Sequence, residues 1–174
     1  MDKLFVYIDG VAKGNPGEAA IGVAITDPEG NVIREESRLI GRATNEVAEY
    51  QALIEACNLA AIYEPQSVFF FTNSQKVANH VNHVFESRAP NIKHLVAIAI
   101  ELLNQFPRWR VNYVDAHANI RAPRLVEQAF HQNTKVQIAR ERMELVLQSR
   151  CTGLSDAALQ RLIETAERLQ EEEL

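Results

Sequence analysis

The chain begins with short apolar runs that have the spacing of strands. Five of the six residues from Leu4 to Asp9 are apolar, and the run is rich in aromatic and β-branched types, which predicts a strand buried on both faces. Two more strands are predicted over 19–26 and 32–40, with a turn at 27–31 in which Gly30 supplies the positive φ. Because the links between these three strands are short, we predict an antiparallel meander.

The pattern then changes to helical spacing. Thr44 is a candidate N-cap, and the residues from Val47 to Ala60 form an apolar helical face. A wholly apolar strand at 68–72 follows this helix, so we expect it to lie parallel to the first strand. Helices at 74–85 and 92–105 and a strand at 109–114 come next. The predicted fold class is therefore α/β, a five-stranded mixed sheet flanked by helices, with three antiparallel strands followed by two parallel ones.

Composition and charge narrow the function classes. The chain has 47% hydrophobic and 24% charged residues, as is usual for a globular protein, and it has neither an apolar run of membrane length nor a signal-peptide pattern. We therefore expect a cytoplasmic protein with no membrane partner. Cys57 and Cys151 are far apart and have no ligand-spaced partner, which favours free thiols over a zinc site. The net charge of −5 argues against a strong general nucleic-acid binder but allows a local basic patch.

Asp9 is the first candidate for chemistry. A carboxylate within a buried strand has to be paired, protonated or bound to a metal, because burying it alone and ionised costs several kcal/mol. The turn from Gly14 to Gly17 can bring backbone amides close to a ligand. The alternative from these residues alone is an Asp that hydrogen-bonds its own turn.

Four motifs follow one another within residues 3–132. They are Tyr7-Ile8-Asp9-Gly10 with Gly14-Asn15-Pro16-Gly17, then Thr44-Asn45-Glu46-Val47-Ala48-Glu49, then Thr72-Asn73-Ser74-Gln75, and finally Asn119-Ile120-Arg121-Ala122-Pro123-Arg124-Leu125. In order and spacing they resemble the motifs of the type 1 ribonuclease H family. The resemblance implies the fold of that family, cleavage of the RNA strand of RNA/DNA hybrids, and two Mg²⁺ ions held by four carboxylates.

The resemblance also implies roles for individual residues. Asp9 stands at the position of the metal-bridging aspartate, and Glu49 at that of the glutamate on the first helix, so both are candidate catalytic and metal-binding residues. The candidate nucleic-acid-binding residues are Gly14, Asn15, Thr44, Asn45, Ser74 and Gln75. His117 matches a loop histidine that helps product or metal release in some members, and an ordinary loop histidine is the alternative. Asp115 or His117 is also a candidate to replace a missing ligand.

Three positions depart from the family pattern. Asn73 and Pro123 stand where the other two metal-binding aspartates are expected, and Glu46 replaces an asparagine expected to contact the RNA strand. Asn still offers a carbonyl oxygen, whereas Pro offers no side-chain ligand. Two carboxylates without the other two are expected to hold at most a single, weakly bound Mg²⁺.

The leading hypothesis is a ribonuclease H-like protein that binds RNA/DNA hybrid or RNA and has lost most or all nuclease activity. One alternative is an active Mg²⁺- or Mn²⁺-dependent ribonuclease H that cleaves the RNA strand of hybrids. The other is a protein-interaction scaffold that binds no nucleic acid. Cleavage of a hybrid that depends on Asp9 distinguishes the active nuclease from the inactive binding protein. Salt-sensitive binding of nucleic acid distinguishes both of these from the scaffold.

A helical pattern continues past the resemblance. Mostly apolar or small residues recur with alternating spacings of three and four, a heptad pattern that predicts one long helix ending near Cys151 to Gly153. These positions are Ala122, Leu125, Ala129, Gln132, Val136, Ala139, Met143 and Val146. A second helix is predicted from Ser155 to about Leu169. We therefore predict a ribonuclease H-like domain at 1–132 and a C-terminal helical hairpin at 133–174. The hairpin either forms a homodimer, which we expect, or folds back on its own domain.

Overall fold

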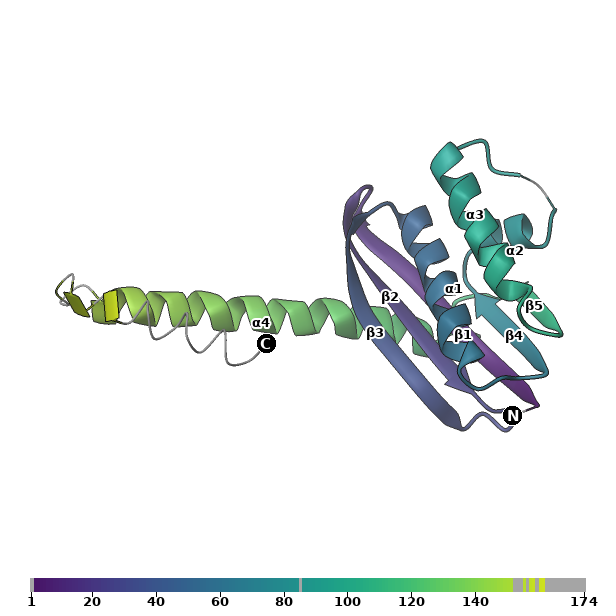
Figure 1. The fold of residues 1–174 in the computed structure, drawn as a ribbon, viewed down its shortest axis with the longest axis horizontal. Helices are drawn as coiled ribbons and strands as arrows, with labels where there is room; N and C mark the ends of the chain where they lie inside the picture. Colours follow the sequence, from purple (N-terminus) through teal and green to yellow (C-terminus); the bar gives the residue numbers. More distant parts are fainter. Residues whose placement is uncertain (1, 85, 152–154, 156, 159, 162–174) are drawn as a thin grey trace. The chain divides into compact units, whose positions relative to one another are not determined.

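The computed structural model describes residues 2–84, 86–151, 155, 157, 158, 160 and 161 (Figure 1). The chain divides into two compact units, Met1–Gln132 and Asn133–Leu174. Its elements in order are β1 (Lys3–Gly14), β2 (Gly17–Thr26), β3 (Val32–Ala43), α1 (Asn45–Ala61), β4 (Ser67–Thr72), α2 (Gln75–Val81), α3 (Pro90–Leu103), β5 (Trp109–Tyr113) and α4 (Arg121–Cys151).

The strands form one five-stranded mixed sheet in the order β3-β2-β1-β4-β5. β1 lies at the centre, paired antiparallel with β2 and parallel with β4. β2 and β3 are antiparallel, and β4 and β5 are parallel. The predicted fold class is confirmed, because the meander and the parallel placement of β4 and β5 are both present.

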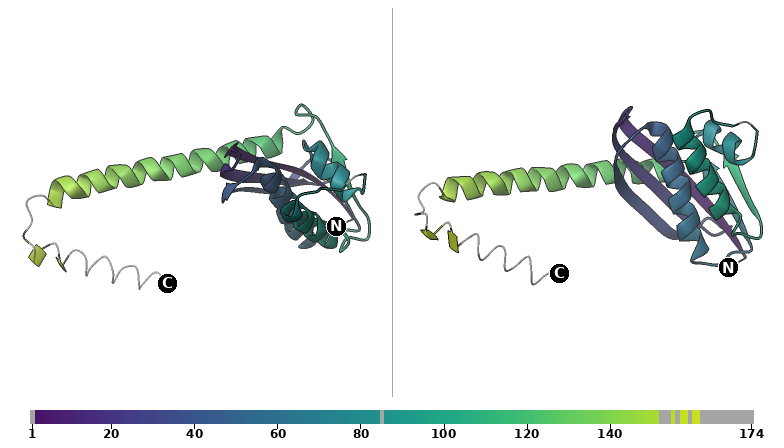
Figure 2. Two further views of the ribbon diagram at one scale, coloured as in Figure 1. Left: turned by 90° about the horizontal axis from the view of Figure 1, so that it is seen from above. Right: turned by 45° about the horizontal axis from the view of Figure 1, so that its top comes forward.

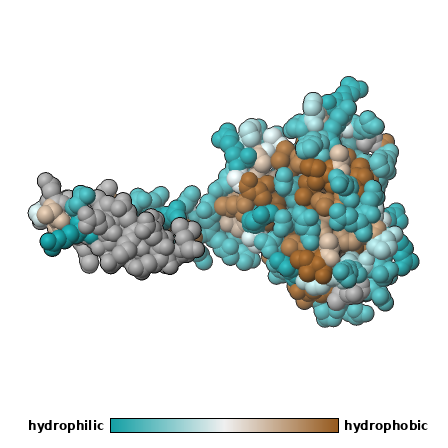
Figure 3. All heavy atoms as spheres, viewed as in Figure 1, coloured by the Kyte–Doolittle hydropathy of each residue, from teal (hydrophilic) through white to brown (hydrophobic). Residues whose placement is uncertain are grey.

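The main core lies between the sheet and the helices α1 and α3. Leu4, Val6 and Ile8 of β1 contribute to it together with apolar residues of α1, α2, α3, β2, β4 and β5. Apolar side chains are also visible between polar ones on the outer surface over these helices (Figure 3). A smaller cluster on the opposite face of the sheet joins Ala20 of β2 to Val126, Ala129 and Phe130 of α4. The start of α4 and the pair α1 and α3 therefore cover opposite faces of the sheet (Figure 2).

Two glycines let the helices approach the central strands closely. A Cβ on Gly10 of β1 would lie 2.2 Å from the carbonyl oxygen of Ala48 in α1, and a Cβ on Gly22 of β2 would lie 2.3 Å from that of Ala122 in α4. Neither position has room for a side chain. Gly22 is the residue of β2 that pairs with Asp9 of β1, so the first turn of α4 packs directly beside the position of Asp9 in the sheet.

Two expectations about these elements are wrong. β1 is fully buried on one face only. Leu4, Val6 and Ile8 are buried, whereas Phe5 and Tyr7 on the opposite face are half-buried. The reason is that α4 packs against Ala20 of β2 and not against Phe5 or Tyr7. α2 is also shorter than the predicted helix at 74–85. It ends at Val81, and the backbone then turns into a left-handed conformation at His83, with φ 58°.

In the second unit, α4 continues to Cys151 and carries large apolar side chains that are exposed. Val136, Ile138, Met143 and Leu145 are between 44% and 65% exposed. The apolar stripe predicted for a final helix, from Leu159 to Leu169, lies outside the described residues. Among the helices in the described part of the chain, none has both the length and the apolar character that crossing a membrane requires.

Candidate functional site

A polar pocket of about 500 Å³ lies where the N-terminal ends of α1, α2 and α3 meet the turn between β1 and β2. Most of its lining residues are amides, hydroxyls and charged groups. They are Asn15, Thr44, Asn45, Glu46, Glu49, Asn73, Ser74, Gln75, Lys76, Ala89, Asn91 and Ile92. Eight residues singled out from the sequence are thus brought together, namely Asn15, Thr44, Asn45, Glu46, Glu49, Asn73, Ser74 and Gln75.

The N-terminus of α1 is tied to the β1–β2 turn by Asn45. Thr44 caps the helix by accepting a hydrogen bond from the Val47 N–H at 3.2 Å. The Asn45 side chain accepts from the Ala12 N–H at 3.2 Å and donates to Glu49 Oε1 at 3.1 Å, while its backbone N–H donates to Asn15 Oδ1 at 3.3 Å. Asn45 therefore holds the turn, the helix and Glu49 in one arrangement.

The N-terminus of α2 is tied to the same glutamate. Ser74 caps α2 by accepting from the Val77 N–H at 3.3 Å, and its hydroxyl donates to Glu49 Oε2 at 2.6 Å. Both oxygens of the Glu49 carboxylate thus accept hydrogen bonds, one from each helix terminus. Glu49 links α1 to α2.

Burial shifts the pKa of both candidate metal-binding carboxylates, Asp9 and Glu49. Burial raises the pKa of Asp9 from 3.8 to about 6, and a hydrogen bond from the Gly10 backbone opposes the rise. Burial also raises the pKa of Glu49; the hydrogen bond from Ser74 lowers it, and the charge of Asp9 raises it. The charge of Asp9 thus acts on Glu49.

Asn73 is held from a direction that the sequence did not indicate. Asn119 Nδ2 donates to Asn73 Oδ1 and to the Ile8 carbonyl oxygen, each at 2.9 Å. Asn119 is fully buried, and its Oδ1 has no hydrogen-bond partner among the described residues. Asn119 is the first residue of the last of the four motifs, which marks it as a candidate site residue, but the sequence alone predicted no role for it.

Four of the predicted site residues lie elsewhere than in the lining of the polar pocket. Asp9 is in the middle of β1, Gly14 ends β1 with φ 107°, and Pro123 is in the first turn of α4. His117 is exposed in a turn where Asp115 Oδ1 accepts hydrogen bonds from the N–H groups of His117, at 2.9 Å, and Ala118, at 3.0 Å. The Asp115 carboxylate thus caps a turn, and the structure does not bring His117 to the polar pocket.

One cation in the pocket was also missed. Lys76 Nζ lies 3.8 Å from Glu46 Oε2, and both side chains are partly exposed. This pair places a positive charge next to the glutamate that departs from the family pattern. Lys76 stood alone in the sequence, and its proximity to Glu46 depends on the packing of α2 against α1.

With this geometry in place, comparison with known proteins defines the class. The reverse transcriptase-like family matches residues 7–129, and the chain belongs to this family within the ribonuclease H-like superfamily. The resemblance drawn from the four motifs is therefore confirmed.

Individual relatives agree with that class. The chain is similar to ribonuclease HI of Halobacterium salinarum, with 34% identity over 74% of this chain and 64% of that protein. It is similar to the bifunctional protein Rv2228c of Mycobacterium tuberculosis, with 31% identity over 74% of this chain and 35% of that one. The matched region thus spans less than two thirds of either relative.

Solved structures show the same fold. The crystal structure of RNase H1 from Halobacterium salinarum matches with a TM-score of 0.72 and 33% identity, covering 75% of this chain and 98% of that one. LC11-RNase H1 in complex with RNA/DNA hybrid matches with a TM-score of 0.71 and 33% identity, covering 75% and 99%.

Proposed function

We propose that this chain binds RNA/DNA hybrid, or RNA, through the polar pocket and has lost efficient nuclease activity. The observation that carries the proposal is the hydrogen bonding of Glu49. Both of its carboxylate oxygens are held by neutral donors, Asn45 and Ser74, which also fix the two helix termini of the pocket. In this arrangement Glu49 organises a hydrogen-bonding surface.

The chemistry of the donor set supports the loss of cleavage. At the two positions that depart from the family pattern, Asn73 Oδ1 accepts a hydrogen bond from Asn119, and Pro123 has no donor atom in its side chain. In the part of the chain that the structure describes, no cluster of three or more His, Cys, Asp or Glu is placed to hold a metal. The residues present do not fit two Mg²⁺ ions, which repel strongly at the separation that two-metal catalysis uses.

The carboxylates of Asp9 and Glu49 leave room for at most one Mg²⁺, bound weakly. Titration calorimetry with MgCl₂ alone is the test. We expect a small heat of binding that Asp9→Asn removes, and a tight site of two ions would contradict the proposal.

Binding is tested by fluorescence anisotropy of a labelled RNA/DNA hybrid, duplex DNA and double-stranded RNA of one sequence. We expect preference for the hybrid or the RNA over DNA, and an affinity that falls as salt rises because Lys76 and other cations contact phosphates. Gln75→Ala removes an exposed lining side chain and is expected to weaken binding, whereas Gln66→Ala, outside the pocket, is the matched control. If none of the three binds below the roughly 10⁻⁴ M of nonspecific contact, the scaffold alternative replaces this one.

An active nuclease is the second candidate, because the chain is similar to proteins named ribonuclease HI and retains Asp9 and Glu49. It predicts cleavage of the hybrid that depends on both Mg²⁺ or Mn²⁺ and Asp9.

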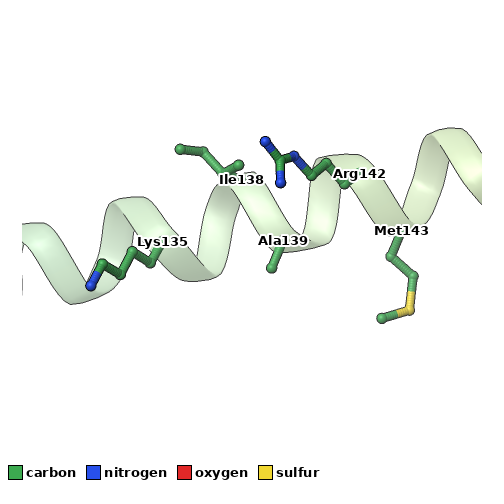
Figure 4. A pocket seen from close by; sticks show the side chains of 5 residues that line it. All are labelled: Lys135, Ile138, Ala139, Arg142 and Met143. Atoms are coloured by element: carbon green, nitrogen blue, oxygen red, sulfur yellow. The ribbon is translucent and has the colours of Figure 1, made fainter.

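We also propose that the second unit forms a homodimer through its helices. The side chains of five residues of α4 border a pocket (Figure 4), namely Lys135, Ile138, Ala139, Arg142 and Met143. Together with the exposed Val136 and Leu145 they leave apolar side chains without cover among the described residues. Light scattering at about 100 μM is expected to give a dimer for the full chain and a monomer after truncation at Gln132. A monomeric full chain would contradict dimerisation.

A further inference from the structure

The face of the sheet opposite α1 and α3 carries an aromatic surface that the proposed function does not use. Phe5 of β1 lies 5.7 Å, ring centre to ring centre, from both Phe69 and Phe71 of β4, and Phe71 stacks on Tyr7 at 5.0 Å. All four rings are half-buried and lie outside both apolar clusters of the fold. We call these four residues the aromatic face. Four adjacent rings on one sheet face, without a covering element among the described residues, indicate a binding surface.

The strand register places the aromatic face in one row of side chains with Asp9. Side chains alternate along a strand, so Phe5, Tyr7 and Asp9 of β1 share one face of the sheet. On β4, Phe69 pairs with Phe5 and Phe71 pairs with Tyr7. Asp9 comes two residues after Tyr7 in the same row of side chains. Asp9 therefore adjoins the aromatic face, although it is not among the residues that line the polar pocket.

Two cations lie beside the aromatic face, although the chain as a whole is acidic. Lys3 Nζ lies 5.6 Å from the centre of the Phe69 ring, and the exposed Arg110 of β5 pairs with Phe69 in the next strand. Asn112 pairs with Phe71 in the same way. None of the residues in these two rows on β2, β1, β4 and β5 is acidic.

A small hollow of about 270 Å³ lies at the Tyr7 end of the aromatic face. It is lined by Tyr7, Thr26, Gly30, Ala118, Ile120 and Arg121. Ile120 is 52% exposed, and the buried hydroxyl of Thr26 has no hydrogen-bond partner in the part of the chain that the structure describes. The hollow combines an aromatic wall, the guanidinium of Arg121, which lies 3.7 Å from Glu35 Oε1, and an unpaired hydroxyl. This combination suits a planar base that carries hydrogen-bonding groups.

We propose that the aromatic face binds a single-stranded segment of nucleic acid that extends from a hybrid held in the polar pocket. Aromatic rings that stack on bases, flanked by Lys and Arg that contact phosphates, are the combination by which proteins bind single strands without sequence preference. The path from pocket to face rests on the proposed function, whereas binding of a single strand to the face does not.

The test compares two labelled hybrids by anisotropy in EDTA, one blunt and one with a single-stranded RNA extension of about ten nucleotides. The extension is expected to tighten binding about fivefold or more in the unaltered chain, since stacking on an aromatic side chain is worth at least that per base. Phe71→Leu is expected to reduce this gain to less than about twofold while leaving the blunt hybrid unchanged. Tyr113→Leu, on the neighbouring strand and opposite face, is the matched control and keeps the gain.

Arg110→Ser gives a second readout. Because the Arg110 side chain is exposed, this substitution is expected to leave the fold intact. It is expected to lower the slope of log affinity against log salt by about one for the extended hybrid only. Arg140→Ser, an exposed arginine of the second unit, is the control and leaves the slope unchanged.

The outcomes separate the two proposals. If the blunt hybrid binds and the extension adds nothing, the aromatic face is not a nucleic-acid surface and the proposed function stands. If a labelled oligouridylate binds in a manner sensitive to Phe71→Leu and Arg110→Ser while the blunt hybrid does not bind, this inference stands and the proposed function fails. If Phe71→Leu leaves oligouridylate binding intact and instead lowers the mass of the particle in light scattering, the face is a protein interface and the inference is overturned.

Discussion

The two halves of the candidate site differ in how their polar atoms are satisfied. At the helix termini, Asn45 and Ser74 hold both oxygens of Glu49 and tie α1, α2 and the β1–β2 turn together. Near β1, Asp9 is buried with its pKa raised to about 6, and the Oδ1 of Asn119 has no partner among the described residues.

The difference shows which half is complete without a cation. Amides and hydroxyls satisfy one another and form a pre-organised surface, whereas a buried carboxylate remains costly until a proton or a metal neutralises it. Substitutions that change only one of the two halves are expected to differ in their effects, and the largest expected effect comes first.

The largest effect is expected at Asp9. Its folded pKa, about 6, lies above the ordinary value of 3.8, so the stability that Asp9 contributes is present in full below about pH 4 and is lost as the pH rises through 6. The loss at pH 7 corresponds to about 3 kcal/mol. We expect Asp9→Asn to recover most of this loss at pH 7 and little at pH 4, measured by urea unfolding in EDTA. Asp115→Asn is the control for an exposed aspartate, and destabilisation by Asp9→Asn at pH 7 would contradict the account.

Asn45→Ala is expected to lower the free energy of unfolding by about 2 kcal/mol, because it removes one hydrogen bond from the Ala12 N–H and another to the Glu49 carboxylate. Hybrid affinity is expected to fall with it, since the β1–β2 turn is no longer held. Asn91→Ala, an exposed asparagine of the same pocket, is the matched control. Equal effects of the two substitutions would show that Asn45 does not organise the pocket.

Ser74→Ala is expected to cost about 1 kcal/mol in thermal unfolding, because α2 loses its N-cap. The pKa of Glu49 is expected to rise further, since the hydrogen bond from Ser74 lowers it in the unaltered chain. The pKa is measured by NMR titration of the Glu49 carboxyl carbon. Ser87→Ala, at an exposed loop hydrogen bond, serves as the comparison, and an unchanged Glu49 pKa in Ser74→Ala would contradict the described contact.

The smallest effect is expected at Glu46. Glu46→Gln removes a negative charge from the rim of the pocket and frees Lys76 for a phosphate. Since exposed ion pairs contribute about 0.2–1 kcal/mol, hybrid affinity is expected to rise by a factor of between about 1.4 and about five at low salt. Glu101→Gln, on the exposed side of α3, controls for the change in net charge. Weaker hybrid binding in Glu46→Gln would show that the glutamate itself is a ligand group.

The sequence predicted the five-stranded mixed sheet and the directions of its strands because these follow from local patterns. Short links give a meander, and a strand after a helix lies parallel to its predecessor. The sequence overestimated the length of α2, because a histidine does not predict the left-handed backbone conformation that His83 adopts after the helix. It also overestimated the burial of β1, because whether a second layer covers Phe5 and Tyr7 depends on the path of α4.

The candidate site was predictable only as far as the motifs reached. Glu49 and Ser74 were named separately, but their contact depends on how α1 packs against α2. Asn119 bonds to Ile8, far away in the sequence, so its role follows from tertiary structure alone. The ion pair of Lys76 with Glu46 likewise follows from tertiary structure and not from a local sequence pattern.

The most direct measurement is an assay of hybrid cleavage by the unaltered chain in Mg²⁺ or Mn²⁺, with Asp9→Asn and the double variant Asn73→Asp, Pro123→Asp beside it. The account predicts that the unaltered chain binds the labelled hybrid and leaves it intact, and that the double variant gains metal-dependent cleavage. Cleavage by the unaltered chain that disappears in Asp9→Asn would contradict the central claim and identify an active ribonuclease H.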